Sequence, residues 1–215
     1  MKMSHLQHFL DDPRGLICLF TRRGVVAIHR AVCTTVTAIV AWTKGIETSG
    51  RISCRGIPYF ERTPHSTIRL GRGCTIHSSF RANHIGIMTR SRIITVTPTA
   101  VIRLGDRVGL SGATVTAHHS ITVGDDTMIG ANSLITDCDW HATDPAERHT
   151  SIGATAPVTI GHNVLIGTRC IVLKGVTIGD DSIIGAGSVV THDIPAGVIA
   201  AGNPCRVIRP IIKEA

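Results

Sequence analysis

The chain has few aromatic residues and no long uninterrupted apolar run. Phe, Trp and Tyr together make up 3% of the residues, whereas 43% are hydrophobic. This composition favours a narrow core of Ile, Val, Leu and Ala over a broad globular core that needs large rings. At 215 residues, the chain is most simply one domain with a modest extension.

A membrane-spanning helix needs roughly 18 to 20 consecutive apolar residues. The stretch from Val25 to Trp42 comes nearest, but His29 and Arg30 interrupt it and several threonines dilute it. It also lacks a small-residue cleavage site in the usual place, which disfavours a signal peptide. We interpret this stretch as a helical cap, with peripheral membrane contact as the alternative.

Cysteine is present but follows no pattern. The seven cysteines include no CxxC pair and no regular spacing. An odd number of this kind does not indicate a disulfide framework or a zinc knuckle, and it fits a reducing compartment. The expected location is therefore cytoplasmic.

The charge balance is basic. The net charge is +7 and the pI is about 9.4, which favours anionic partners such as coenzyme phosphates, nucleotide sugars or a lipid surface. A solvated basic face would explain the same balance. Nucleic acid is not an expected partner, because the arginines are scattered, stacking aromatics do not accompany them and no DNA-binding motif is present.

A repeat with a period of six residues dominates the C-terminal half. Its members are the β-branched residues Ile160, Ile166, Val172, Ile178, Ile184 and Val190, and glycine follows four of them. This period matches neither an α-helix nor a coiled coil, but it fits short straight segments that turn a corner every six residues. Three segments make one coil, and stacked coils form a parallel β-helix with Ile and Val pointing inward. The predicted fold class is therefore an all-β solenoid behind a helical or mixed N-terminal extension.

The register of the repeat divides the chain. Residues 1–48 carry no repeat and form the extension, residues 49–205 form the solenoid domain, and residues 206–215 form a C-terminal tail. A weaker register runs through Leu70, Ile76, Ala82, Met88 and Ile94, and a clearer one through Leu104, Leu110, Thr116, Val123, Ile129 and Ile135. Between Ile135 and Ile160 the register fails, so residues 136–157 are expected to leave the coil as a loop. Function concentrates in such loops when a rigid scaffold holds their ends.

The loop carries residues suited to acid–base chemistry. Trp140 and His141 stand side by side between the acidic residues Asp139 and Asp144. A neutral histidine can accept a proton from an alcohol or an amine, and a nearby carboxylate could orient its ring. Asp137, Asp139 and Asp144 are all close enough in sequence for that orienting role. A solvated histidine in a polar loop remains the ordinary alternative.

The run from Asp139 to Pro145, together with the stretches Val176 to Thr191 and Ala200 to Arg209, resembles the hexapeptide-repeat acyltransferases of the sugar and polysaccharide O-acetyltransferase branch. The resemblance implies a left-handed parallel β-helix, with His141 as the general base and Asp139 and Asp144 as its catalytic companions. It also implies acetyl-coenzyme A as donor, direct transfer to a sugar hydroxyl without a metal, and a homotrimer whose groove a neighbouring subunit completes.

The family pattern nominates further binding residues. The coenzyme contacts it implies are Gly167, Thr168, Gly185, Ala186, Thr191, Ala201, Arg206 and Arg209, the two arginines facing its phosphates. The acceptor-binding candidates are Ser111, His118, His119 and Trp140. Leu165 stands where sugar acetyltransferases often carry tryptophan, so the identity of the acceptor does not transfer. A nucleotide sugar and a lipid-linked sugar both remain candidate acceptors.

Three alternatives stay open at this point. The acyl acceptor could be the amino group of an amino sugar instead of a hydroxyl. A zinc-dependent β-helix lyase resembling carbonic anhydrase is a second possibility, although the sequence lacks the His-x4-His pair of those enzymes. A non-catalytic solenoid scaffold is the third.

Overall fold

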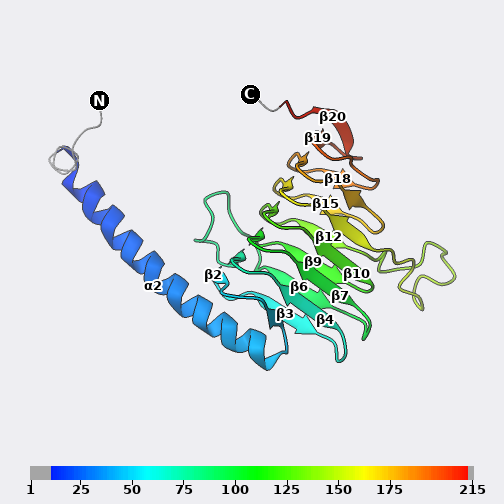
Figure 1. The fold of residues 1–215 in the computed structure, drawn as a ribbon, viewed down its shortest axis with the longest axis horizontal. Helices are drawn as coiled ribbons and strands as arrows, with labels where there is room; N and C mark the ends of the chain where they lie inside the picture. Colours follow the sequence, from blue (N-terminus) through cyan, green and yellow to red (C-terminus); the bar gives the residue numbers. More distant parts are fainter. Residues whose placement is uncertain (1–10, 213–215) are drawn as a thin grey trace.

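The computed structural model describes residues 11–212, and these fold into a three-sided parallel β-helix with one long helix, α2, beside its first coils (Figure 1). We name its faces sheets A, B and C. Sheet A comprises β1 (Glu47–Thr48), β4 (Thr67–Leu70), β7 (Val101–Leu104), β10 (Ser120–Val123), β13 (Val158–Ile160) and β16 (Thr177–Ile178).

Sheet B comprises β2 (Ser53–Arg55), β5 (Thr75–His77), β8 (Gly109–Ser111), β11 (Met128–Ile129), β14 (Leu165–Ile166), β17 (Ile183–Ile184), β19 (Val198–Ala201) and β20 (Arg206–Pro210). Sheet C comprises β3 (Tyr59–Arg62), β6 (Arg92–Thr95), β9 (Thr114–Ala117), β12 (Leu134–Thr136), β15 (Ile171–Val172) and β18 (Val189–Val190). The chain visits A, B and C in turn, so each strand pairs with the strand one coil away. The predicted solenoid is therefore confirmed.

The core consists of three columns of aliphatic side chains, one behind each sheet. The parallel registers place equivalent inward residues directly above one another. All members of these columns are essentially excluded from solvent: behind sheet A Leu70, Leu104, Val123, Ile160 and Ile178; behind sheet B Cys54, Ile76, Leu110, Ile129, Ile166, Ile184 and Ala200; behind sheet C Phe60, Ile93, Val115, Ile135, Val172 and Val190. Because each residue packs on its own equivalent, one hexapeptide pattern satisfies every coil.

The weaker N-terminal register is partly wrong. Ala82 and Met88 belong to a second segment that leaves the coil, residues 78–91 between β5 and β6, and Met88 is 74% exposed. In sheet C, Ile93 is the inward residue where the weaker register indicated Ile94. Val115 is the inward residue where the clearer register indicated Thr116, which is also buried. The register fails at Ala82 and Met88 because an apolar residue spaced six from its neighbour resembles a core position even where the backbone has left the coil.

Backbones approach one another closely where sheet A turns into sheet B. A Cβ added to Gly124 would lie 2.6 Å from the carbonyl carbon of Gly161 in the next coil. The aspartates that follow such glycines accept an N–H from the same corner of the preceding coil: Asp125 Oδ1 accepts the Asp106 N–H at 2.8 Å, and Asp180 Oδ1 accepts the His162 N–H at 2.7 Å. Glycine followed by aspartate closes this corner in three coils, at Gly105, Gly124 and Gly179, whereas His162 follows Gly161.

Helix α2 (Pro13–Thr43) begins after Asp12, whose side chain accepts the Gly15 N–H, and has proline in its first turn. Its C-terminal half packs against the solenoid through the buried residues Cys33, Thr37 and Ala41. Its N-terminal half extends beyond the solenoid (Figure 1). Among the described residues it is the one helix long and apolar enough to cross a membrane by length and composition.

The ends of the solenoid lie slightly outside the expected boundaries. Strand β1 at Glu47–Thr48 already pairs in parallel with β4, so the first coil starts inside the expected extension. At the other end Arg206–Pro210 forms β20, which pairs antiparallel with β19. A segment expected as a tail therefore continues sheet B and closes its edge.

Candidate active site

The expelled loop, residues 137–157, leaves the solenoid at the corner between sheets C and A (Figure 1). Its two arms pair with each other near its base: Asp139 N–H donates to the Ala154 carbonyl at 3.1 Å, and Ala142 N–H to the Ser151 carbonyl at 3.1 Å. Cys138 and Thr155 form an antiparallel bridge. These bonds give the loop a defined shape without help from the core.

Asp137 anchors the start of the loop. Its carboxylate is fully buried and accepts the backbone N–H groups of His118 and His119, both at 2.7 Å. Two successive N–H groups form a concavity that suits an anion. These histidines lie between Thr116 and Val123, whose spacing of seven is one residue longer than the repeat, and their backbone presents both donors to one carboxylate.

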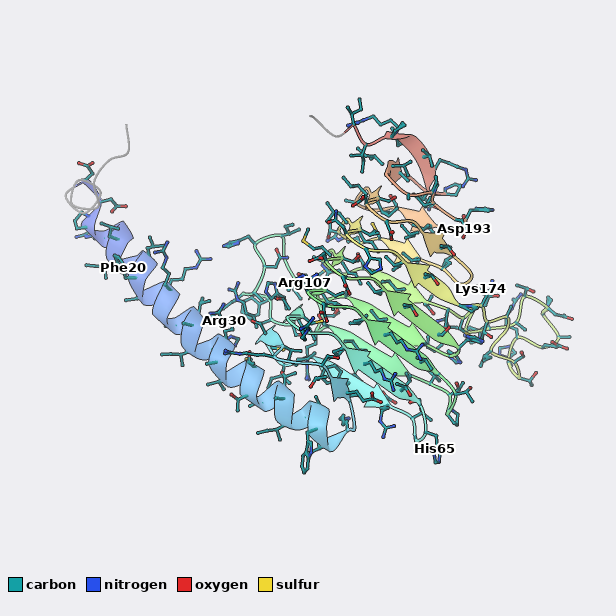
Figure 2. All side chains as sticks on the ribbon, viewed as in Figure 1. Phe20, Arg30, His65, Arg107, Lys174 and Asp193 are labelled. Atoms are coloured by element: carbon teal, nitrogen blue, oxygen red, sulfur yellow. The ribbon has the colours of Figure 1, made fainter. Side chains whose placement is uncertain are left out.

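A second anchor lies on the other side of the loop base. Lys174 Nζ lies 2.7 Å from Asp139 Oδ1, and both side chains are about one-third exposed or less. Lys174 follows β15 at the corner one coil above, beside the base of the loop (Figure 2). This ion pair ties the segment before Trp140 and His141 to the rigid coil.

His141 is exposed in the first arm of the loop, and its ring has one hydrogen-bond partner among the described residues. Its Nδ1 lies 3.1 Å from the Arg148 carbonyl oxygen. A carbonyl oxygen can only accept, so Nδ1 carries the proton. In the neutral ring the lone pair is therefore on Nε2, the nitrogen that faces no described protein partner.

The carboxylates near His141 make other contacts. Asp139 pairs with Lys174, Asp137 binds the two backbone N–H groups, and Asp144 Oδ1 accepts the Ala146 N–H at 2.9 Å. The expected orienting carboxylate is replaced in this structure by a backbone carbonyl. A catalytic contribution of Asp139 or Asp144 stays a prediction.

Trp140 and His118 form a pair beside the loop. Their ring centroids are 4.9 Å apart with planes at 87°. The indole Nε1–H donates to Thr136 Oγ1 at 3.0 Å, and the backbone of Trp140 has φ +68°. A tryptophan in the left-handed region is strained, and such strain often accompanies function.

The imidazole of His118 has an unusual environment. The residue is 6% exposed, and both ring nitrogens are buried with no hydrogen-bond partner among the described residues. Buried polar groups are nearly always bonded, so an exception of this kind needs an explanation. By contrast His119 is exposed, with Nδ1 lying 3.1 Å from Ser120 Oγ.

Cys138 is not suited to nucleophilic chemistry. The thiol is buried, lies 3.5 Å from the Ile152 carbonyl oxygen, and its Sγ accepts the Trp140 N–H at 3.2 Å. Burial raises the pKa of this thiol above its ordinary value. It is therefore protonated at neutral pH and serves to shape the loop base.

The residues nominated for the coenzyme lie on more than one edge of the solenoid. Gly167, Thr168, Gly185 and Ala186 lie where sheet B turns into sheet C, which is the edge opposite the loop along sheet C (Figure 1). Thr191 follows β18 on the same edge as His141, and Ala201 ends β19. The structure therefore does not bring the whole nominated set together within one chain.

The two nominated arginines lie on β20. Both are exposed, and their guanidinium groups donate only to nearby carbonyls: Arg206 to Cys205 at 2.9 Å and Arg209 to Pro210 at 3.2 Å. Neither forms an ion pair with a described residue. Each keeps donors available for an anion.

Ser111 ends β8 on sheet B and accepts from the Asn83 amide at 3.3 Å. It therefore belongs to the sheet B side, whereas His118, His119 and Trp140 gather around the base of the His141 loop. Sequence reasoning missed Arg148 and Lys174. A lysine in a coil corner and a backbone carbonyl carry no sequence signal that separates them from surface residues.

In residues 11–212, no group of three or more His, Cys, Asp or Glu side chains is placed to hold a metal ion.

Comparison with known proteins adds an independent observation. The family description "Hexapeptide repeat of succinyl-transferase" matches residues 120–136 and 157–192. These two segments are the coils immediately before and after the expelled loop.

The galactoside O-acetyltransferase of Escherichia coli K12 is 45% identical over 98 residues, which cover 46% of this chain and 48% of that protein. The chain spans about half the length, or less, of the curated relatives it matches.

Two solved structures share the fold over most of the chain. One is AntD, an N-acyltransferase from Bacillus cereus with dTDP and 3-hydroxybutyryl-CoA; it has a TM-score of 0.63 and 16% identity, and the match covers 81% of this chain and 88% of that one. The other is a hexapeptide-repeat acetyltransferase from Vibrio cholerae with acetyl coenzyme A, at a TM-score of 0.52, 21% identity and coverages of 81% and 76%. At these identities the similarity establishes the fold alone.

Proposed function

The chain belongs to the hexapeptide-repeat acetyltransferase family, and on this premise we propose that it moves an acetyl group from acetyl-coenzyme A to a hydroxyl of a sugar or polysaccharide precursor. The observation that carries the proposal is the state of His141. Its Nδ1 is committed to the Arg148 carbonyl, so Nε2 offers a lone pair at an exposed position. A general base needs that arrangement.

The chemistry balances without a covalent enzyme intermediate. Nε2 of His141 removes the proton from the acceptor hydroxyl while the oxygen attacks the thioester carbonyl. The tetrahedral intermediate then collapses, the carbon–sulfur bond breaks, and the imidazolium returns its proton to the departing coenzyme thiolate. The products are the acetyl ester and free coenzyme A. The Arg148 carbonyl holds the ring in place and stabilises the protonated form by accepting from Nδ1.

The donor site follows from the corners of the upper coils. A Cβ on Gly167 would lie 2.5 Å from the Ala186 nitrogen, so adjacent coils leave room only for glycine there. A pantetheine arm could follow the small residues Gly167, Gly185 and Ala186 and hydrogen-bond to free backbone groups. Arg206 and Arg209 would bind its phosphates through their planar donors.

A second copy of the chain would join the two proposed halves of this site. His141 lies at the corner between sheets C and A, whereas Gly167 and Ala186 lie at the corner between sheets B and C. Sheet C separates these corners within one chain. We therefore infer that the loop of one copy faces the B–C corner of its neighbour, and a closed ring of three copies satisfies this heterologous contact.

The acceptor would lie beside the loop base. Trp140 is 41% exposed and presents an aromatic surface that suits the apolar face of a sugar ring. His118 and His119 lie on the same side, and Ser111 would reach the acceptor from a neighbouring copy's sheet B. The resemblance to a galactoside O-acetyltransferase supports a hydroxyl acceptor.

Replacement of the base tests this proposal. The His141→Ala variant should lose about 10²- to 10⁴-fold in kcat with acetyl-coenzyme A, because proton removal in the transition state supplies that factor. The measurement is coenzyme thiol release with a panel of sugars, amino sugars and nucleotide sugars. His149→Ala, at an exposed histidine of the same loop, is the matched control and should retain activity.

The same panel separates the other outcomes. Wild-type turnover only with amino sugars would assign N-acetylation, and equal turnover of His141→Ala and wild type would remove His141 from the mechanism. If the wild type neither binds acetyl-coenzyme A nor releases its thiol with any acceptor, the acetyltransferase proposal fails.

A further inference from the structure

The outward face of α2 is largely apolar, with Thr21, Gly24 and Thr35 between its apolar side chains, and no described part of the chain covers it. Its members lie on the side of the helix opposite the buried residues Cys33, Thr37 and Ala41, and each is more than half exposed. We call this set the apolar ridge: Ile17, Phe20, Val25, Ile28, Val32, Ile39 and Trp42. At 1.5 Å per residue the 31-residue helix is roughly 46 Å long, so the ridge is a long surface and not a local patch.

Arginines line a cleft on one flank of the ridge. This cleft, of about 600 Å³, separates α2 from the first coils of the solenoid and contains Arg30, Arg51 and Arg72. Arg72 pairs with Asp106 through two guanidinium nitrogens. The guanidinium groups of Arg30 and Arg51 have no hydrogen-bond or ion-pair partner among the described residues, so their positive charges are unneutralised.

Arginines also line the other flank of the apolar ridge. A cleft between α2 and the segment 78–91 contains Arg22 and Arg81, and Arg55 lines the adjoining pocket. Arg22 reaches across this cleft to His84, with Nη2 2.6 Å from Nε2. In the described part of the chain no acidic residue lines these clefts, although Asp106 beside the first cleft pairs with Arg72. An apolar ridge therefore lies between two rows of positive charge.

This arrangement matches the surface of an anionic membrane. A helix that lies in the plane of a bilayer inserts its apolar face among the acyl chains and keeps Arg and Lys at the level of the phosphates. We propose that α2 binds the chain to an anionic lipid surface, with the apolar ridge inserted and the flanking arginines contacting lipid phosphates. In Figure 2, the label Phe20 marks the apolar ridge and the label Arg30 marks one of the flanking arginines.

The structure favours this partner over the other possible occupants. Two features argue against a helix that spans the bilayer. Cys33, Thr37 and Ala41 are buried against the solenoid, and Arg22, Arg23 and Arg30 would lie within the hydrocarbon region, where charges are costly. A second copy docked ridge to ridge would bring the arginine rows of both copies together without acidic partners. Like charges in an interface disfavour that contact.

Binding to lipid vesicles tests the proposal with the full chain. The wild type should co-sediment with vesicles of phosphatidylcholine and phosphatidylglycerol, weakly with phosphatidylcholine alone, and less well as salt rises. Ile28→Gln should weaken partitioning into the vesicles on the order of tenfold, because an aliphatic side chain that would insert among the acyl chains is lost. Met128→Gln, at a similarly exposed apolar residue of the solenoid, should bind like the wild type.

A second pair of variants tests the electrostatic contribution to lipid binding. Arg30→Gln should weaken binding to the anionic vesicles about fivefold, whereas Arg103→Gln, at an exposed arginine of β7, should not. Circular dichroism of each variant checks that helix content is unchanged.

Four results would overturn the proposal. The wild type could fail to bind anionic vesicles, or Ile28→Gln could bind as tightly as the wild type. A chain retained in membranes after alkaline carbonate extraction would show that α2 spans the bilayer. Loss of an oligomer on Ile28→Gln without any vesicle binding would assign the ridge to a second copy.

Discussion

His118 and His141 illustrate opposite uses of one side chain. His141 is exposed and its single ring contact fixes the position of the proton, whereas His118 is buried and both of its nitrogens lack partners among the described residues. A buried polar group without a partner costs about 1–3 kcal/mol. The acceptor-binding role proposed for His118 would account for that cost, and a substitution can test it.

Replacing His118 by an apolar ring separates stability from function. His118→Phe removes both unpaired nitrogens and should stabilise the fold by about 1 kcal/mol, which corresponds to a rise in Tm of about 2–4 °C. If the ring binds the acceptor, the same variant should raise the KM for the acceptor and leave the KM for acetyl-coenzyme A unchanged. Thermal unfolding and steady-state kinetics measure the two effects.

His119→Phe is the control, because His119 is exposed and should change Tm little. An unchanged acceptor KM in His118→Phe would show that the ring only packs against Trp140.

Sequence reasoning nominated His141 correctly as a loop residue but could not find its orienting partner. The three aspartates near it were the natural candidates, yet Asp137 and Asp139 hold the loop base instead. The partner is a carbonyl of Arg148, and every residue carries a carbonyl. Such a contact depends on how the loop folds back, which residue types do not specify.

At the level of the element, the corner between sheets A and B limits which residues the coil accepts. A methyl group on Gly124 would contact the backbone of Gly161, which cannot move without displacing a whole coil. A methyl group on Gly24, in the free half of α2, would have no described heavy atom within 4 Å beyond its own helix backbone and chain neighbours. The same substitution should therefore have opposite effects at these two positions.

Gly124→Ala and Gly24→Ala should change the stability of the fold in opposite directions. Gly124→Ala should destabilise the fold by roughly 1–3 kcal/mol through overpacking, whereas Gly24→Ala should stabilise α2 by about 1 kcal/mol, because alanine loses less backbone entropy in a helix. Thermal unfolding followed by circular dichroism measures both. Equal effects at the two positions would contradict the close approach of the coils.

The elements also differ in how far the sequence predicts them. From Val123 to Val190 the inward residues follow the hexapeptide register, since each coil repeats one set of contacts and only the expelled loop interrupts it. The segment 78–91 was missed because Phe80, Ile85 and Met88 look like core residues, although each is more than two-thirds exposed. The apolar content of α2 was visible in the sequence. Which face of the helix stays uncovered depends on tertiary packing.

At the level of the whole molecule, the division of the site between two corners leads to a complementation test. His141→Ala lacks the base, and Ala186→Trp should block the donor groove at the exposed corner of β17 and β18. Each variant alone should be inactive. If the site joins the loop of one copy to the corner of the next, mixed assemblies contain some intact sites.

Random mixing of equal amounts should restore about one quarter of the wild-type activity, because a site is intact only when both contributing copies carry the right half. Coexpression followed by purification of the mixed assembly provides the sample, and light scattering gives its subunit number. Zero recovery in a verified mixed assembly would place the whole site within one chain.

The antiparallel strand β20 has a consequence for assembly. Every other neighbouring pair of strands in the described solenoid is parallel, so an uncapped last coil would present a ready template for another coil. Because β20 reverses direction against β19, a coil arriving at sheet B meets a strand of the wrong polarity. This mismatch at sheet B disfavours end-to-end growth of the solenoid into a filament.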